Sequence, residues 1–290
     1  MEHALLAVAA KTYDFVTPVT HRAPLLCFTQ KPGLTPHCRC DFMLTKSKFL
    51  EKLAVFGRNH PRARSYDRVI SIGSNCEVTW NIRHHFKTGK AYPFDWWMTP
   101  FHALLDVLDA RFSGLFEPSN LSVPADRGTV VDTRFNLMYH HDFARDEDGR
   151  VIVDDLEKQL ADLRKKYARR AERFVNELDG KKVLFVRNRC GNDPVYLNGD
   201  YGDIQPDQCM QIQRALSALL PRTRFDLFAT NKPGFEAFSY RGSEIFSDSI
   251  IEYGDCSDYM VSPRGWAEMF ERNRIVLRAA DKASAVAVTA

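Results

Sequence analysis

Residues Tyr66–Phe86 of this chain read YDRVISIGSNCEVTWNIRHHF, and this stretch decides the fold. Its segment VISIGSN, at 69–75, joins an apolar run typical of a buried strand to a tight turn. After the turn, apolar side chains recur at Val78, Ile82 and Phe86, and this spacing of four residues predicts a helix. We therefore expect a strand that leads through a short turn directly into a helix.

Cys76 lies where this helix is expected to begin. Ser74 and Glu77 have the spacing of a capping box, which predicts Ser74 as the N-cap and Cys76 as the second helical residue. Unpaired N–H groups and the helix dipole stabilise a thiolate there, so we expect the pKa of Cys76 to fall below the free value of about 8.5. Such a thiol suits acyl transfer. The structural alternative is a cysteine that only fills core space.

The composition is that of an ordinary globular protein, with 44% hydrophobic and 27% charged residues and a net charge of +3 over 290 residues. We expect no nucleic-acid partner. No apolar run approaches the ~20 residues that span a bilayer, and Glu2 stands where a signal peptide carries a basic residue. Seven cysteines, an odd number, indicate reduced thiols and a cytoplasmic location. Phosphate-binding, dinucleotide-binding and zinc motifs are missing, so we expect no cofactor and no metal.

The pattern along the chain predicts three parts. Residues 1–65 combine prolines and basic residues without a sustained period, which indicates an N-terminal extension. We expect an α/β domain over residues 66–280 and a short tail over 281–290.

Two apolar runs, Lys182–Arg187 and Phe225–Thr230, are typical of strands that are buried on both faces of a parallel sheet. A helical pattern over Pro206–Leu220 separates them. The alternation predicts an α/β fold with a three-layer, mostly parallel sheet flanked by helices. Further helices are expected over Asp154–Leu178 and from Pro263 to about Leu277.

The segment KAYPFDWW, at 90–97, gathers four large aromatic side chains around Asp95. We favour a packing role for this cluster, in which fixed donors satisfy the buried carboxylate. In the functional interpretation, Asp95 and Trp96 contact a substrate.

Two strands are expected over Thr129–Thr133 and Phe135–His141, and the second ends in two histidines. Side chains alternate along a strand, so His140 and His141 should face opposite sides, and only one of them can meet a site.

Five short motifs occur in the order SIGSNC at 71–76, PFDW at 93–96, HD at 141–142, KYARRAERF at 166–174 and LFVR at 184–187. Together they resemble a bacterial family described as papain-like cysteine peptidases. Its members form a domain of unknown function that is often associated with polysaccharide and glycosyl-transfer systems. The resemblance covers roughly residues 66–230.

The resemblance implies Cys76 as the nucleophile and His141 as the base, with Asn188 or Asp193 to orient the imidazole. We expect Ser74 and Asn75 in the turn, like Asp95 and Trp96, to contact substrate. Papain-like enzymes place an oxyanion-hole glutamine shortly before the cysteine, whereas positions 68–72 here read RVISI.

Three functions remain open at this point. The first is a cysteine hydrolase or acyltransferase that acts on an unknown peptide, acyl or saccharide substrate through a Cys–His pair. The second is a carbohydrate- or nucleotide-sugar-handling protein whose aromatic segment 90–97 stacks on a sugar. The third is a non-catalytic interaction module that uses the basic face of helix 154–178.

Overall fold

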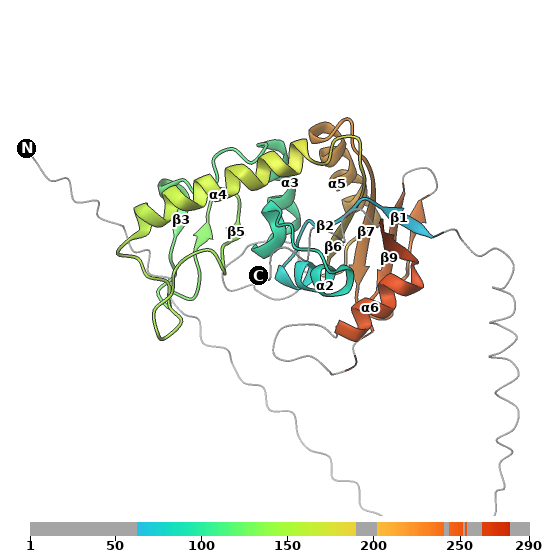
Figure 1. The fold of residues 1–290 in the computed structure, drawn as a ribbon. Coiled ribbons are helices and arrows are strands. Elements are labelled where there is room, and N and C mark those ends of the chain that lie inside the picture. Colours follow the sequence, from blue (N-terminus) through green and yellow to red (C-terminus); the bar gives the residue numbers. More distant parts are fainter. Residues whose placement is uncertain (1–62, 190–201, 241–243, 252, 254–262, 279–290) are drawn as a thin grey trace, which may run out of the picture. The chain divides into compact units, whose positions relative to one another are not determined.

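A five-stranded, mostly parallel sheet forms the centre of the computed structural model, which describes residues 63–189, 202–240, 244–251, 253 and 263–278 (Figure 1). The strand order is β2-β6-β7-β9-β8. The first four strands run parallel, and β8 pairs antiparallel to β9 at the edge. The bounds are β2 (Arg68–Ser71), β6 (Lys182–Asn188), β7 (Arg224–Asn231), β8 (Ser239–Tyr240) and β9 (Ile245–Ser249).

The central strands are apolar on both faces, and each face has its own core. In β6, Val183 and Phe185 belong to one hydrophobic cluster, while Leu184 and Val186 belong to a second. All four are fully buried. Because side chains alternate along a strand, the continuous apolar run of β6 serves both faces.

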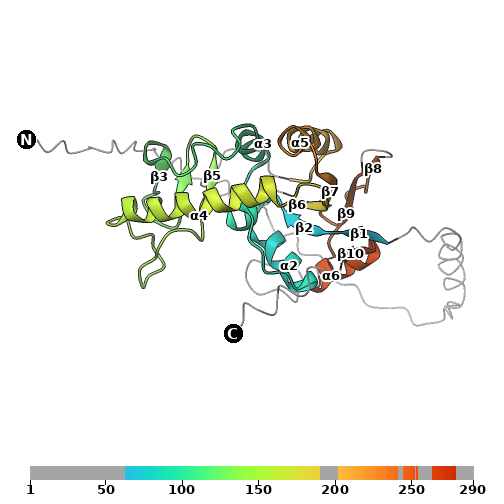
Figure 2. The same ribbon diagram turned by 45° about the horizontal axis from the view of Figure 1, so that its top comes forward.

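Helices contribute side chains to the core on each face of the sheet. The second cluster receives side chains from α2 (Cys76–Phe86) and α6 (Pro263–Arg272). The first receives them from α3 (Phe101–Asp109), α4 (Leu156–Asn176) and α5 (Pro206–Leu219). Figures 1 and 2 show α5 on one side of β6 and β7, and α2 with α6 on the other. This confirms a mixed fold of helices with a mostly parallel sheet; a three-layer domain stays a prediction.

Two smaller sheets complete the described structure. A three-stranded antiparallel sheet contains β3 (Leu121–Ser122), β4 (Val131–Asp132) and β5 (Leu137–Met138). Strand β1 (Arg64–Tyr66) pairs in parallel with β10 (Ile275–Leu277). Short 3-10 helices are η1 (Pro93–Trp96) and η2 (Pro118–Asn120). None of the helices in the described ranges combines the length and apolarity needed to cross a membrane.

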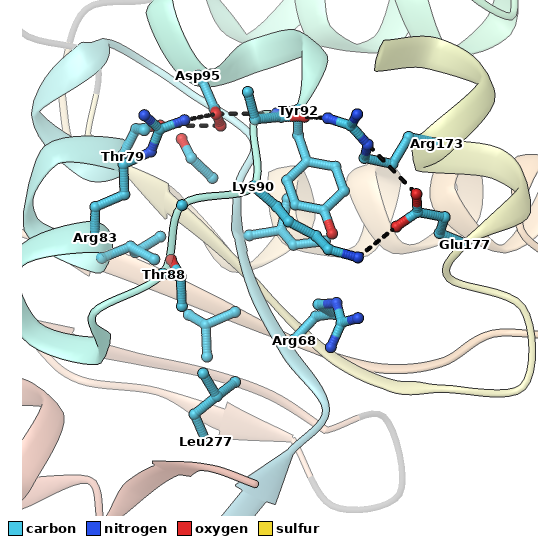
Figure 3. A pocket seen from close by; sticks show the side chains of 16 residues that line it. Arg68, Thr79, Arg83, Thr88, Lys90, Tyr92, Asp95, Arg173, Glu177 and Leu277 are labelled. Atoms are coloured by element: carbon cyan, nitrogen blue, oxygen red, sulfur yellow. Dashed lines mark hydrogen bonds and ion pairs between the residues drawn. The ribbon is translucent and has the colours of Figure 1, made fainter. Parts of the chain in front are cut away.

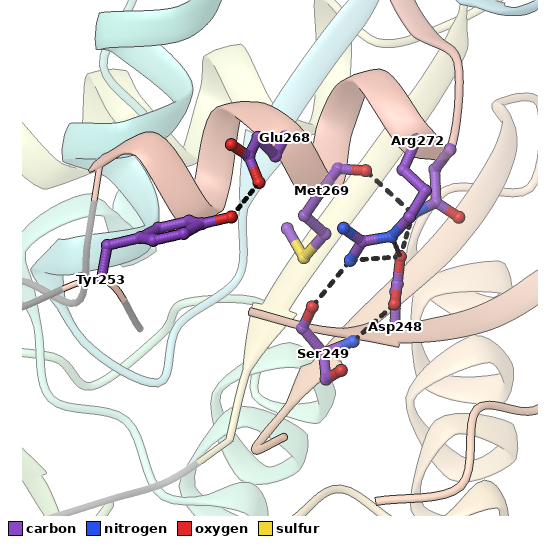
Figure 4. A network of polar contacts seen from close by, with 7 residues as sticks. Asp248, Ser249, Tyr253, Glu268, Met269 and Arg272 are labelled. Carbon is purple, nitrogen blue, oxygen red and sulfur yellow. Dashed lines mark hydrogen bonds and ion pairs between the residues drawn. The ribbon is translucent and has the colours of Figure 1, made fainter. Parts of the chain in front are cut away.

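Polar contacts fix α6 to the end of β9 (Figure 4). Asp248 accepts hydrogen bonds from Arg272 Nε at 3.0 Å and from Asn273 Nδ2 at 2.5 Å. Arg272 also donates to the Ser249 carbonyl at 2.9 Å, and the Tyr253 hydroxyl donates to Glu268. These contacts give α6 a defined position relative to the sheet.

Three predicted elements are wrong in extent. The last helix ends at Arg272 instead of Leu277, because Arg274 adopts a left-handed backbone with φ 53° and the chain continues as β10. The two strands expected over 129–133 and 135–141 are each only two residues long. Asp132 accepts the N–H groups of Arg134 and Phe135, and this side-chain turn interrupts the ladder.

Candidate active site

The turn between β2 and α2 lies at the carboxyl ends of the parallel strands, where ligands bind in open α/β sheets. Gly73 has φ +89°, and a Cβ atom there would lie 3.0 Å from Arg187 Nη1 and 3.2 Å from Thr99 Cβ. Only glycine combines this backbone with so close an approach. The Gly73–Ser74 peptide bond is cis. Strand-to-helix entry through this turn confirms the predicted path of the chain.

Arg187 holds the turn in place from inside the core. Its side chain is only 2% exposed and donates to the carbonyls of Ile72 and Thr99, both at 2.9 Å. A buried guanidinium needs such fixed acceptors, because its charge is otherwise costly to remove from water. The sequence analysis did not predict that Arg187 supports the turn. The signal that could have indicated this role is an arginine directly after the apolar run of a buried strand.

Ser74 is not the N-cap of α2, which corrects the predicted capping box. Its hydroxyl donates to the Arg189 carbonyl at 2.8 Å, across to the end of β6. Asn75 occupies the N-cap position without a side-chain cap bond, and Cys76 is the first helical residue. Ser74 is buried and therefore supports the turn; its contact with a substrate stays a prediction.

Asn75, the residue before Cys76, carries a side-chain oxygen that accepts no hydrogen bond from the described residues. Its Oδ1 is buried and has no hydrogen-bond partner within the described part of the chain. Buried polar atoms normally have partners, so an exception beside a candidate nucleophile is a functional clue. This agrees with the predicted substrate contact of Asn75 without testing it.

The pKa of Cys76 shifts in the direction opposite to the predicted one. The side chain is half-buried, and this burial raises the pKa of the thiol, with a further increase from the Glu77 carboxylate. Hydrogen bonds from the backbone N–H groups of Cys76 and Glu77 act against the increase but do not overcome it. Desolvation therefore outweighs the helix start, and the resting side chain is a thiol.

Glu77 and Asn188 belong to a buried polar network beside this turn. Glu77 accepts hydrogen bonds from Trp266 Nε1 at 2.7 Å and from Asn188 Nδ2 at 3.3 Å. The Asn188 oxygen in turn accepts the Thr230 hydroxyl at 2.9 Å. The network joins α2 to α6, β6 and β7. Asn188 thus lies next to the Cys76 turn, but no hydrogen bond joins it to His141 in the described structure.

His141 lies in a turn after β5, where its side chain and that of His140 are both exposed. The expectation that the two alternate along a strand is wrong, because β5 ends at Met138. The His141 ring packs edge-on against Trp96, with ring centroids 5.7 Å apart. The side of the His141 ring that faces the protein is removed from water although the residue is exposed, and this desolvation lowers the pKa of His141, while Asp142 opposes the change. The imidazole is therefore mainly neutral at pH 7.

Asp142 does not orient the imidazole through its carboxylate. That group is 1% exposed and accepts Trp97 Nε1 at 3.0 Å, Lys166 Nζ at 2.7 Å and the Tyr167 hydroxyl at 2.8 Å. Asp142 therefore anchors the histidine turn to α4. Asp193, which the resemblance implies as an alternative to Asn188 for orienting the imidazole, lies outside the described residues.

Trp96 connects the histidine to the helix that carries the thiol. The Arg83 guanidinium on α2 lies 5.1 Å from the Trp96 ring centroid. The same indole ring also contacts His141. Cys76 and Arg83 are two turns apart on α2 and share a face of the helix. The Trp96 indole thus lies between His141 and Arg83, which is on the same helix as Cys76; the pairing of Cys76 with His141 stays a prediction.

The aromatic segment is mainly core. Tyr92, Phe94 and Trp97 are at most 4% exposed, so they cannot stack on a sugar face. Asp95 accepts hydrogen bonds from the Thr79 hydroxyl at 3.2 Å, Arg83 Nη2 at 2.8 Å and the Tyr92 N–H at 3.0 Å. These contacts support the packing role that we favour for Asp95. Trp96 alone of the four aromatic residues is half-buried.

The fold and the turn define an α/β domain in which a cysteine opens a helix at a parallel strand end. A family model described as "Putative papain-like cysteine peptidase (DUF1796)" matches residues 67–217, just over half of the chain. The chain belongs to this family. The match includes Cys76, His141 and Asn188. Comparison with curated proteins and with solved structures gave no significant match.

Proposed function

We propose that this protein is a cysteine hydrolase or acyltransferase that uses Cys76 as nucleophile and His141 as general base. The observation that carries the proposal is the place of Cys76, half-buried at the first position of α2, where the backbone N–H groups of the first helical turn have no partner within the helix. Its membership of a family described as papain-like cysteine peptidases supports the same chemistry.

The shifts in pKa favour a neutral resting pair over a preformed ion pair. Burial raises the pKa of Cys76 and lowers that of His141, so thiol and imidazole are both uncharged near pH 7. The imidazole takes the thiol proton as sulfur attacks the carbonyl carbon, and the first-turn N–H groups of α2 hold the oxyanion. The imidazolium then protonates the leaving group, and water or another acceptor releases the acyl group from sulfur.

Hydrolysis of p-nitrophenyl acetate by the full chain tests the proposal. We expect p-nitrophenol release together with an acetyl adduct that maps to Cys76 by mass spectrometry. Cys76→Ala should abolish the adduct, and His141→Ala should slow acylation by about 10²–10⁴-fold, the usual contribution of a general base.

His102→Ala is the matched control, since His102 is an exposed histidine on α3. It should acylate at the wild-type rate. The proposal fails if His141→Ala and His102→Ala behave alike, or if acetyl groups appear on the cysteines indiscriminately.

A further inference from the structure

A cavity of about 380 Å³ lies beside α2 (Figure 3). Neither Cys76 nor His141 lines it. Its walls come from four distant parts of the chain: β2, the helix α2 with the segment that follows it, the end of α4, and Leu277 of β10. The volume falls within the range of small-molecule sites in proteins.

The lining carries an excess of positive charge. Four cationic side chains face two carboxylates, and these residues are Arg68, Arg83, Lys90 and Arg173 with Asp95 and Glu177. Asp95 is buried and bonded to Arg83, so that pair belongs to the wall. Of the other three cations, Lys90 and Arg173 form ion pairs with Glu177, and Arg173 also donates to the Ala91 carbonyl at 2.7 Å. Arg68 donates to the Asp67 carbonyl at 2.7 Å.

The Glu177 carboxylate is itself an oxyanion bound by cations on this side of the cavity. Its carboxylate lies 2.9 Å from Lys90 Nζ and 3.5 Å from Arg173 Nε, and these cations together with Arg68 hold its pKa below the ordinary value against the effect of burial. The Glu177 side chain is 41% exposed, so a ligand carboxylate or phosphate can compete with it for the same cations.

Tyr92 adds a donor that the protein itself does not use. The residue is 4% exposed, and its buried hydroxyl lies beside Arg68 but donates its proton to no acceptor among the described residues. Figure 3 shows this hydroxyl directed into the cavity on the side of Arg68. Burial raises the pKa of Tyr92 to about 12, so the hydroxyl keeps its proton and can donate it. An unpaired buried hydroxyl costs folding stability, and a bound acceptor would satisfy it.

We propose that this cavity binds an organic oxyanion, a small molecule with a phosphate or carboxylate head on a compact apolar body. The head lies between Arg68, Lys90 and the Tyr92 hydroxyl. The body packs against Val69, Ile82 and Leu277, which supply the apolar part of the lining.

Calorimetric titration of the full chain at low ionic strength tests the site with four probes: phenyl phosphate, benzoate, inorganic phosphate and phenol. We expect one saturable site for phenyl phosphate, for benzoate or for both, and the result identifies the head group. Phenol lacks the charge and should not bind. Inorganic phosphate should bind more weakly than phenyl phosphate, because it lacks the apolar body. Absence of saturable binding by both organic anions overturns the proposal.

Four substitutions separate this site from a general effect of charge. Arg68→Gln should weaken binding at least about tenfold, and Tyr92→Phe about fivefold, as expected for a charge-assisted and a neutral hydrogen bond. Glu177→Gln removes the competing carboxylate and should strengthen binding. The control Arg222→Gln, at an arginine that is 79% exposed in an ion pair with Asp179, should leave binding unchanged.

Stability measurements test whether weaker binding by a variant results from misfolding. Tyr92→Phe should leave the free protein as stable as wild type or more so, because it removes an unpaired hydroxyl. Cys76→Ala should bind the probes normally, so failure of the proposed catalysis and failure of this site are distinguishable. Weaker binding in Glu177→Gln, or equal effects of Arg68→Gln and Arg222→Gln, would contradict the assignment.

Discussion

At the scale of single residues, Cys76 shows that the start of a helix does not by itself make a thiolate. The N–H groups of the first turn favour the anion, but burial and the adjacent Glu77 carboxylate favour the thiol, and burial is the largest of these effects. A thiol in this state depends on a base for its reactivity, which is why the proposed chemistry needs His141.

Alkylation of Cys76 by iodoacetamide should therefore rise with pH, with a midpoint above the free-thiol value of about 8.5, since only the thiolate reacts. Cys209 should react far more slowly, because it is 1% exposed and burial raises its pKa to about 12. Peptide mapping by mass spectrometry at several pH values measures both. A Cys76 midpoint below pH 8 would contradict the role of burial.

At the scale of elements, Glu77 decides how α2 joins the rest of the domain. The sequence indicated a helix-capping role for it, whereas in the structure it is a buried acceptor for Trp266 on α6 and Asn188 on β6. The first turn of α2 is thus held by long-range hydrogen bonds, and so is the backbone that carries Cys76.

Glu77→Ala should lower the free energy of unfolding by about 2–4 kcal/mol, because it leaves the Trp266 N–H and the Asn188 amide buried without their acceptor. Urea denaturation followed by circular dichroism measures the change. Glu172→Ala, at an exposed glutamate on α4, is the control and should stay within about 0.5 kcal/mol of wild type. A Glu77→Ala variant as stable as this control would show that the hydrogen bonds of Glu77 do not contribute to stability.

At the scale of the whole described domain, the main sheet and the small sheet β3-β4-β5 share one core. The larger hydrophobic cluster contains Phe185 and Leu227 from the main sheet together with Leu137 from β5. Asp142 reinforces this connection, because its buried carboxylate joins the turn after β5 to Trp97 and to α4.

Asp142→Ala should lower the free energy of unfolding by about 3 kcal/mol, because Trp97 Nε1 and the Tyr167 hydroxyl lose a charged acceptor inside the core. Tryptophan fluorescence and circular dichroism should report one coincident transition, as expected for a shared core. Asp148→Ala, at an aspartate that is 71% exposed, should have no comparable effect. Two separate transitions in the wild-type protein would show that the sheets unfold independently.

Local patterns in the sequence were sufficient for much of the fold. The apolar runs of β6 and β7, the four-residue spacing of α2 and the entry of Cys76 into a helix all depend on near neighbours in the chain, and the structure confirms them. The approximate extent of α4 and α5 follows from the same periodicity. The family could also be identified, because its motifs are short and local.

Tertiary structure alone decided the properties that make the candidate sites. The pKa of Cys76 depends on what buries it, and the partners of Ser74, Glu77 and Asn188 are more than 100 residues away in the chain or on other elements. Gly265 is a similar case: alanine suits a helix better, but its Cβ would lie 2.0 Å from the Ile251 carbonyl oxygen. The cavity that we propose as an oxyanion site likewise exists only because β2, α2, α4 and β10 meet. Sequence patterns report the period of a segment, whereas burial, charge pairing and cavities arise between segments, and the fold decides which segments meet.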